Sequence, residues 1–324
     1  MNRNTAYRCA VACAALAALS SQPVYADADG NKPVRLIVPY VTGHPVDVLA
    51  HLLSAQLAEQ KSVPLVIDNR PAVDGLIGTE MVAKESVPDG HTLLIVSNEH
   101  AMYAALGRKL PYNPTKDFSP ITQVADRQLL LVANPSLQVS SVKDLVALAK
   151  KEPGKLQYAS SSQMLSLPME LFKMSTATKI EAAPLAAPRP LLTEVIDGPA
   201  QVAMVDAAAA LPHVKQERLR ALAVGDAQRS AAVPDVPTMA EAGVRGYRAA
   251  LWSGLLAPPK TPKAIIERLN KQMLQAVRAP EFKEKLAQLG ADPVGSTPVV
   301  WGKFIESEIV KWRKVAHTAK LKID

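Results

Sequence analysis

The stretch VRLIVPYVTGHPVDVLAHLLSAQL, residues 34–57, decides the fold class of this chain. Its first part, 34–38, is a short apolar run that predicts a strand, and Pro45 and Asp47 fit the first turn of a following helix. Apolar residues recur at helical spacing from Val46 to Leu57, which indicates one buried helix face. Strand, tight loop and helix start form one α/β unit, and the unpaired N–H groups of the helix start favour a small anion or polar ligand.

Similar units follow along the rest of the chain. Further short apolar runs predict strands at 65–68, 92–96, 129–133, 201–205 and 219–224. Helical patterns between them include 142–150 and 169–173. This alternation predicts an α/β sheet with helices on both faces. Thr261-Pro262 and Thr297-Pro298 fit two further helix starts in which threonine is the cap.

The first 26 residues have the pattern of a secretory signal peptide. Arg3 and Arg8 give a positive start, residues 9–19 are apolar and small, and Val24-Tyr25-Ala26 fits a small-residue cleavage site. The apolar run is shorter than the roughly 20 residues that span a bilayer, which argues against a membrane anchor. We therefore expect a periplasmic protein that is cut after Ala26.

Composition excludes several classes of function. Both cysteines, Cys9 and Cys13, lie in the signal, so the mature chain has no disulfide and no thiol chemistry. Removal of the signal, which has two arginines and no acidic residue, lowers the formal charge from +7 to +5. Aromatic residues make up only 4% of the chain and the basic residues are dispersed, which argues against a nucleic-acid partner.

The sequence shows no recognisable catalytic motif. It has no glycine-rich phosphate loop, no G-x-S-x-G, no H-E-x-x-H and no paired cysteines. His44 and His51 are seven residues apart and need a third contributor to hold one metal. Asp206 follows a predicted strand and fits a catalytic acid, but without a partner base or nucleophile a binding or structural carboxylate is favoured. We expect no enzyme, no metal and no cofactor.

Short motifs recur in one order from about Lys32 to the C terminus. They are RLIVP (35–39), DNRP (68–71), PDGHTLL (88–94), KLPYNP (109–114) with DF (117–118), KLQYASS (155–161), LPHVK (211–215) with LRALAV (219–224), and PDVPT (234–238) with EAG (241–243). In this order the chain resembles the Bug family, the periplasmic receptors of tripartite tricarboxylate transporters. No single motif is specific, but the colinear set is.

The resemblance implies a two-lobed α/β periplasmic binding protein, type II-like, in which each lobe is a sheet flanked by helices. Two extended hinge crossings, at 129–133 and 250–256, join the lobes. Lobe 1 is then 27–130 plus 253–324, and lobe 2 is 131–252.

The function that the resemblance implies is solute binding. The receptor captures a small molecule by lobe closure and presents it to the membrane subunits of a transporter, as a monomer. An accessory protein that has lost its ligand, or that signals to a membrane sensor, is the alternative.

The resemblance also places the ligand between loops of the two lobes. The candidate ligand-binding residues are Tyr40, Val41, Thr42, Gly43, His44, Asp47, Asp74, Gly75, Ser97, Asn98, Glu99, Ser160, Ser161, Ser162, Gln163, Leu185, Ala186, Arg189 and Asp206.

Several of these residues depart from the pattern of the family. Asp74 and Glu99 stand where small residues are expected, and Leu185-Ala186 replaces part of a run that contains a lysine. Two added carboxylates and a lost cation disfavour a dianion, with Arg189 the only nearby compensating charge. We expect dicarboxylates to bind weakly and a neutral, aromatic or cationic molecule to bind better. The alternative is that the side chains of Asp74 and Glu99 point to solvent.

Overall fold

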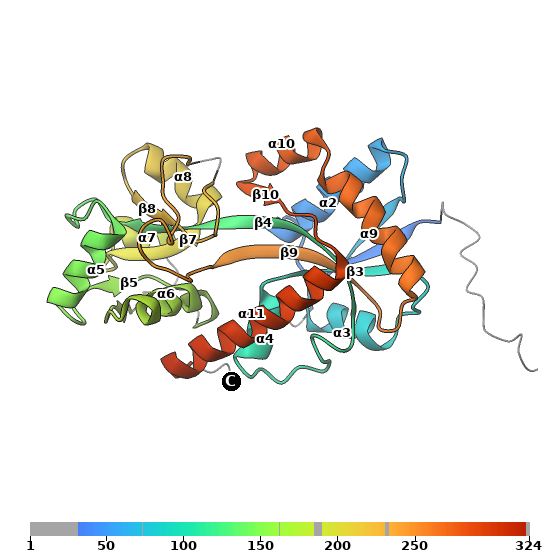
Figure 1. Ribbon diagram of the computed structural model, residues 1–324, viewed down its shortest axis with the longest axis horizontal. Coiled ribbons are helices and arrows are strands. Elements are labelled where there is room, and N and C mark those ends of the chain that lie inside the picture. The colour runs from blue at the N-terminus through green and yellow to red at the C-terminus, as the bar shows by residue number, and fades with distance from the viewer. Residues whose placement is uncertain (1–31, 73, 162, 185–189, 231–232, 322–324) are drawn as a thin grey trace, which may run out of the picture. The chain divides into compact units, whose positions relative to one another are not determined.

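The computed structural model describes residues 32–321 apart from 73, 162, 185–189 and 231–232 (Figure 1). Its strands form one mixed sheet in the order β2-β1-β3-β9-β4-β7-β5-β6, and β10 and β8 pair with β4. The strands are β1 (Val34–Val38), β2 (Leu65–Asn69), β3 (Thr92–Ser97), β4 (Ser119–Ala133), β5 (Gln157–Tyr158), β6 (Glu181–Ala182), β7 (Val202–Asp206), β8 (Arg220–Val224), β9 (Ala250–Ala257) and β10 (Ala291–Pro293).

Strand β4 runs through two groups of strands. Its residues 119–128 pair antiparallel with β9, which in turn pairs with β3, and β1 lies parallel to β3 and β2. Its residues 129–133 pair antiparallel with β7 and β8. The change of partner falls between Gln128 and Leu129, beside the predicted lobe boundary at 130. Because residues 31–324 cluster as one compact unit, the lobe boundaries stay a prediction.

Helices cover both faces of the sheet, as the alternation of elements predicts (Figure 1). They are α2 (Pro45–Glu59), α3 (Leu76–Lys84), α4 (Glu99–Ala105), α5 (Val142–Lys151), α6 (Gln163–Thr176), α7 (Leu191–Ile196), α8 (Ala207–Lys215), α9 (Lys263–Val277), α10 (Pro280–Gln288) and α11 (Pro298–Ala319). Neighbouring residues of β1 point to opposite faces, as a strand requires. Leu36 packs with α2, α9 and α10, whereas Ile37 packs with α3 and α11.

One of the two predicted threonine helix caps is confirmed. Thr297 caps α11, because its Oγ1 accepts from the N–H of Val300 at 3.3 Å. The prediction for Thr261 is wrong: its hydroxyl donates to the carbonyl of Pro258 at 2.8 Å, and α9 begins without a side-chain cap. Among the described residues, no helix combines the length and the apolar character that crossing a membrane requires.

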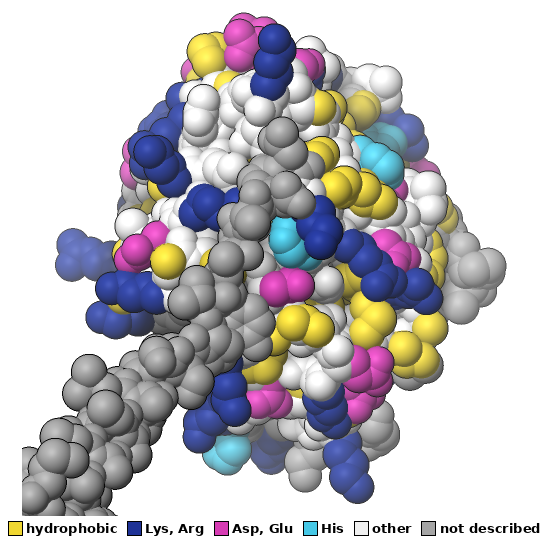
Figure 2. Space-filling view, turned by 90° about the vertical axis from the view of Figure 1, so that its right-hand side faces the viewer, with side chains coloured by type: hydrophobic (Ala, Val, Ile, Leu, Met, Phe, Trp, Pro, Cys, Tyr) yellow, Lys and Arg dark blue, Asp and Glu magenta, His cyan; other side chains and the backbone are white. Residues whose placement is uncertain are grey.

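The surface is mixed in charge. On the face that Figure 2 shows, basic and acidic side chains are interspersed with single hydrophobic ones. Exposed helices carry ion pairs at i,i+4 spacing, such as Lys84–Glu80 at 2.8 Å.

Candidate ligand-binding site

The loop before α2 is held by its own side chains. The rings of Tyr40 and His44 stack with centroids 4.4 Å apart. The N–H of Gly43, at φ +84°, donates to Asp47 Oδ2 at 2.8 Å, and the N–H of Val46 donates to His44 Nδ1 at 3.2 Å. The N–H of Val46 at this helix start is therefore already satisfied, which leaves fewer donors for a ligand than the sequence predicts.

Two titratable groups set the charge of this loop. Burial alone would raise the pKa of Asp47, but hydrogen bonds from the Asn69 side chain and from Gly43 N–H hold it below its ordinary value. Desolvation, and then the positive charge of Arg127, lower the pKa of His44. His44 is therefore neutral at pH 7, in agreement with its acceptor role at Nδ1, and the loop carries the negative charge of Asp47.

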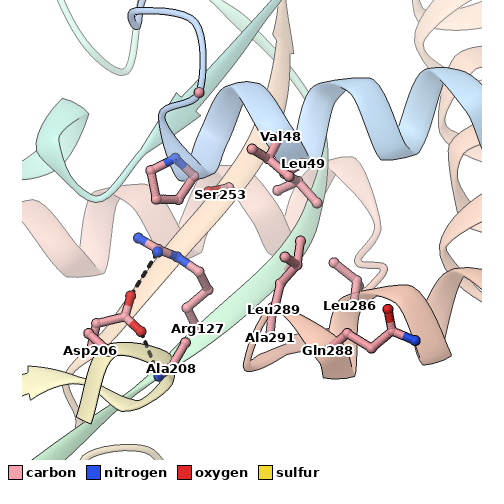
Figure 3. A pocket seen from close by; sticks show the side chains of 14 residues that line it. Val48, Leu49, Arg127, Asp206, Ala208, Ser253, Leu286, Gln288, Leu289 and Ala291 are labelled. Atoms are coloured by element: carbon pink, nitrogen blue, oxygen red, sulfur yellow. Dashed lines mark hydrogen bonds and ion pairs between the residues drawn. The ribbon is translucent and has the colours of Figure 1, made fainter. Parts of the chain in front are cut away.

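A cavity of about 390 Å³ lies between the start of α2, the end of α10 and the start of α8 (Figure 3). We call it the α10 cavity. Its lining is Gly43, Pro45, Val48, Leu49, Ala125, Arg127, Asp206, Ala208, Ala209, Ser253, Leu286, Gln288, Leu289 and Ala291. Helices from distant parts of the chain thus meet around one space, and most of its wall is apolar.

Arg127 and Asp206 supply the charge of the α10 cavity. Arg127 projects from β4, and its Nη1 lies 2.7 Å from Asp206 Oδ2 (Figure 3). Asp206 is also the N-cap of α8, since its Oδ1 accepts from the N–H of Ala208 at 2.9 Å. Both side chains are mostly buried, with 23% and 20% of their surface exposed. The carboxylate is therefore satisfied, whereas the guanidinium keeps further donors.

A second cavity, of about 550 Å³, adjoins the first and shares Asp206 and Ala209 with it. We call it the α7 cavity. Its remaining lining is Asn98, Met102, Leu129, Pro168, Pro190, Leu191, Leu192, Thr193, Met204, Val205, His213 and Leu251. This wall is also mainly apolar.

The predicted site residues fall into several groups. Gly43 and Asp206 line the α10 cavity, and Asn98 and Asp206 line the α7 cavity. Ser160 is partly buried and Ser161 exposed; both lie outside these two linings. Ser162, Leu185, Ala186 and Arg189 lie outside the described residues, and Gln163 is the first residue of α6, with its side chain also outside the description.

Tyr40, Ser97 and Glu99 lie together beside the loop. The hydroxyl of Tyr40 donates to Ser97 Oγ at 2.8 Å, and the N–H of Glu99 donates to the same oxygen at 3.3 Å. Burial raises the pKa of Glu99, and the carboxylate of Asp74 adds to the rise. Glu99 and Asp74 both border a space of only about 20 Å³, too small for an organic ligand.

Other predicted residues lie at the surface. Asp74 is 64% exposed and pairs with Arg108 Nη2 at 2.9 Å, so its charge is compensated away from the two cavities. Val41 and Thr42 are exposed. Gly75, in contrast, is buried; it precedes α3 at φ +77°, and a Cβ there would collide with the carbonyl oxygen of Pro39, so only glycine allows this close approach of the backbone.

Sequence reasoning missed Arg127 and Ser253, which line the α10 cavity from β4 and β9. The premise that Arg189 is the only nearby cation is therefore wrong. A signal was present, because Gln123, Asp126, Arg127 and Gln128 put polar side chains into a stretch that leads into a buried strand. No group of three metal-ligating side chains occurs within the part of the chain that the structure describes.

Residues 49–321 match the model of the tripartite tricarboxylate transporter family receptor, TctC. The chain belongs to this family. Its relatives include Protein BugT of Bordetella pertussis (strain Tohama I), 35% identical over 93% of this chain and 94% of that protein. As a TctC receptor, the chain captures a small molecule between two lobes for delivery to a membrane transporter, and the family is one of receptors rather than enzymes.

Solved structures of the family show the same two-lobed α/β fold. Rpa4515 of R. palustris, solved with adipate, is 35% identical and superposes with a TM-score of 0.71 over 90% of this chain and 98% of that one. MatC (Rpa3494) from Rhodopseudomonas palustris, with bound malate, is 27% identical, with a TM-score of 0.66 over 87% and 98%. The expected fold class and family are thus confirmed.

Proposed function

We propose that this TctC receptor binds a small organic acid and that Arg127 is the partner of the ligand carboxylate. The observation that carries the proposal is the position of Arg127 in the wall of the α10 cavity, next to the loop that begins α2. His44, in that loop, is neutral, and the carboxylate of Asp206, in the cavity wall, is already satisfied. Arg127 is therefore the group that attracts an anion.

The relatives support the same class of ligand. Rpa4515 is solved with adipate and MatC with malate; both molecules are dicarboxylates, so they support a carboxylate group in the ligand. A planar guanidinium offers five donors, of which Asp206 occupies part, so a second carboxylate can bind without breaking the Arg127–Asp206 pair.

Isothermal titration calorimetry with a panel of mono- and dicarboxylates tests the proposal on wild type and on Arg127→Gln. We expect the variant to bind the best ligand about 10- to 100-fold more weakly, the loss of a charge-assisted hydrogen bond. Arg127→Lys keeps the charge and should recover part of the affinity, which separates the loss of charge from a distorted wall.

Arg229→Gln is the matched control. Arg229 pairs with Glu241 at 2.9 Å and lines neither cavity, so its removal should leave affinity unchanged. Equal binding by wild type and Arg127→Gln would contradict the proposal. A failure of every carboxylate to bind would favour the accessory protein that has lost its ligand.

We also propose the compartment, the partners and the lobe boundaries. The pattern of residues 1–26 supports export to the periplasm with cleavage after Ala26, and the family supports membrane transporter subunits as partners of a monomeric receptor. The change of partner along β4 supports lobes at 27–130 plus 253–324 and at 131–252.

The intact mass of protein from a periplasmic extract checks the processing. We expect a chain that begins at Asp27. A mass that retains Cys13 with an attached lipid would contradict this.

A further inference from the structure

Taking the proposed function as its basis, we infer that the ligand is a monocarboxylate with an extended apolar body, and that this body occupies the α10 cavity. Nothing in the motifs of the sequence points to α10 as part of the site. The cavity wall does so, through its charge, its apolar surface and its position.

The charge of the α10 cavity suits one carboxylate. Among the described residues that line it, Arg127 and Asp206 are the charged side chains, and they already compensate each other. Binding of one ligand carboxylate gives these three groups a net charge of −1, and the carboxylate then lies beside guanidinium donors that Asp206 does not use. A second ligand carboxylate would meet no further cation among the described residues of this lining, so its desolvation would be compensated less well.

The apolar part of the wall suits a hydrocarbon body. Val48 and Leu49 of α2 face Leu286 of α10 and Leu289, the residue after α10, across the cavity (Figure 3). A volume of about 390 Å³ is within the range of cavities that enclose a small organic ligand. Each methylene that moves from water into such a wall favours binding by about fourfold, the equivalent of about 0.8 kcal/mol.

Truncation of Leu289 changes the apolar wall of the α10 cavity selectively. Leu289 follows the last residue of α10 and is only partly buried, and it is not a member of the apolar core that contains Leu286. Its truncation therefore alters the cavity without opening the core. Leu192 has the same side chain and is also partly buried, but it lines the α7 cavity, so it is a matched control.

The experiment is calorimetry with butyrate, hexanoate, octanoate and adipate on wild type, Leu289→Ala and Leu192→Ala. For wild type we expect affinity to rise about fourfold per methylene from butyrate to octanoate. Adipate has the chain length of hexanoate with a carboxylate at each end, and we expect it to bind more weakly than hexanoate. Leu289→Ala should weaken octanoate by about tenfold and flatten the series, whereas Leu192→Ala should leave the series unchanged.

Two results would overturn the inference: adipate binding as tightly as hexanoate, or a chain-length dependence that Leu289→Ala leaves intact. A flattened series in Leu192→Ala alone would move the body to the α7 cavity and also overturn it. Val48→Ala, on the opposite wall, repeats the test if Leu289→Ala melts early. If no monocarboxylate or dicarboxylate binds at all, the proposed function fails instead.

Discussion

At the scale of single residues, His100 is a buried histidine that the structure keeps neutral. It is 5% exposed, its Nε2 lies 2.9 Å from the carbonyl oxygen of Pro114, and its ring packs against the rings of Tyr112 and Phe118. A carbonyl only accepts, so Nε2 carries the proton. Burial lowers the pKa of His100 from 6.5 to about 4. The unfolded chain therefore takes up this proton at higher pH than the folded one, and stability is lost as the pH falls from 6.5 towards 4.

We predict that the difference in free energy of unfolding between wild type and His100→Gln is smaller at low pH than at neutral pH. Glutamine keeps a donor for Pro114 but does not titrate, so it lacks the loss of about 3 kcal/mol that the shifted pKa of His100 imposes. Urea unfolding of both proteins at about pH 7 and about pH 4 measures this difference at each pH. If the two proteins differ in free energy of unfolding by the same amount at both pH values, the result would contradict a buried, neutral His100.

Residue identity alone predicted two residues that line the α10 cavity, which we propose as the ligand site, but it missed Arg127. Asp206 and Gly43 were found because they follow strands, where α/β folds place ligands. Arg127 lies in the middle of a strand, and whether a strand side chain faces a cavity depends on which elements pack against it. Asp74 was chosen for its charge, but its pairing with Arg108, 34 positions away in the sequence, depends on tertiary structure.

At the scale of elements, the turn before α3 depends on a glycine for two separate reasons. Gly75 has φ +77°, and a Cβ there would collide with the carbonyl oxygen of Pro39 and lie 2.8 Å from Pro39 Cβ. Gly107, after α4, has a similar φ of +80° with nothing within 4 Å of its Cβ position. A side chain would strain the left-handed backbone at both glycines, but only at Gly75 would it also collide with another part of the chain.

We predict that Gly107→Ala lowers the free energy of unfolding by about 1 kcal/mol, the cost of a left-handed backbone for alanine. Gly75→Ala should cost at least about 3 kcal/mol, because β1 and α3 must also separate. Chemical denaturation of both variants measures the difference. Equal losses would show that the turn before α3 relaxes freely.

Many elements were predictable from the sequence, because buried strands are continuous apolar runs and helices such as α2 have apolar residues at helical spacing. Strands β1, β3 and β8 fall within a residue of the predicted runs. Strand β4 begins at Ser119, ten residues before the predicted run at 129, because its first part carries polar side chains. Its length matters, since this first part carries Arg127.

At the scale of the whole molecule, the proposed ligand site lies where distant segments meet. A Cβ on Gly290, just after α10, would lie 2.9 Å from the Cβ of Ala208 in α8, which shows how closely these helices approach. The α10 cavity lies at this junction, between α2, α8 and α10. The two-lobed fold was predictable from the colinear motifs, but this cavity was not, because no local pattern records which helices come together.

A crystal structure of the receptor with octanoate shows whether Arg127 binds the ligand carboxylate. We predict a carboxylate oxygen at about 3 Å from the guanidinium of Arg127, with the Arg127–Asp206 pair intact and the chain lying against Leu49, Leu286 and Leu289. A complex whose ligand carboxylate binds elsewhere, with Arg127 still contacting Asp206 alone, would contradict the account.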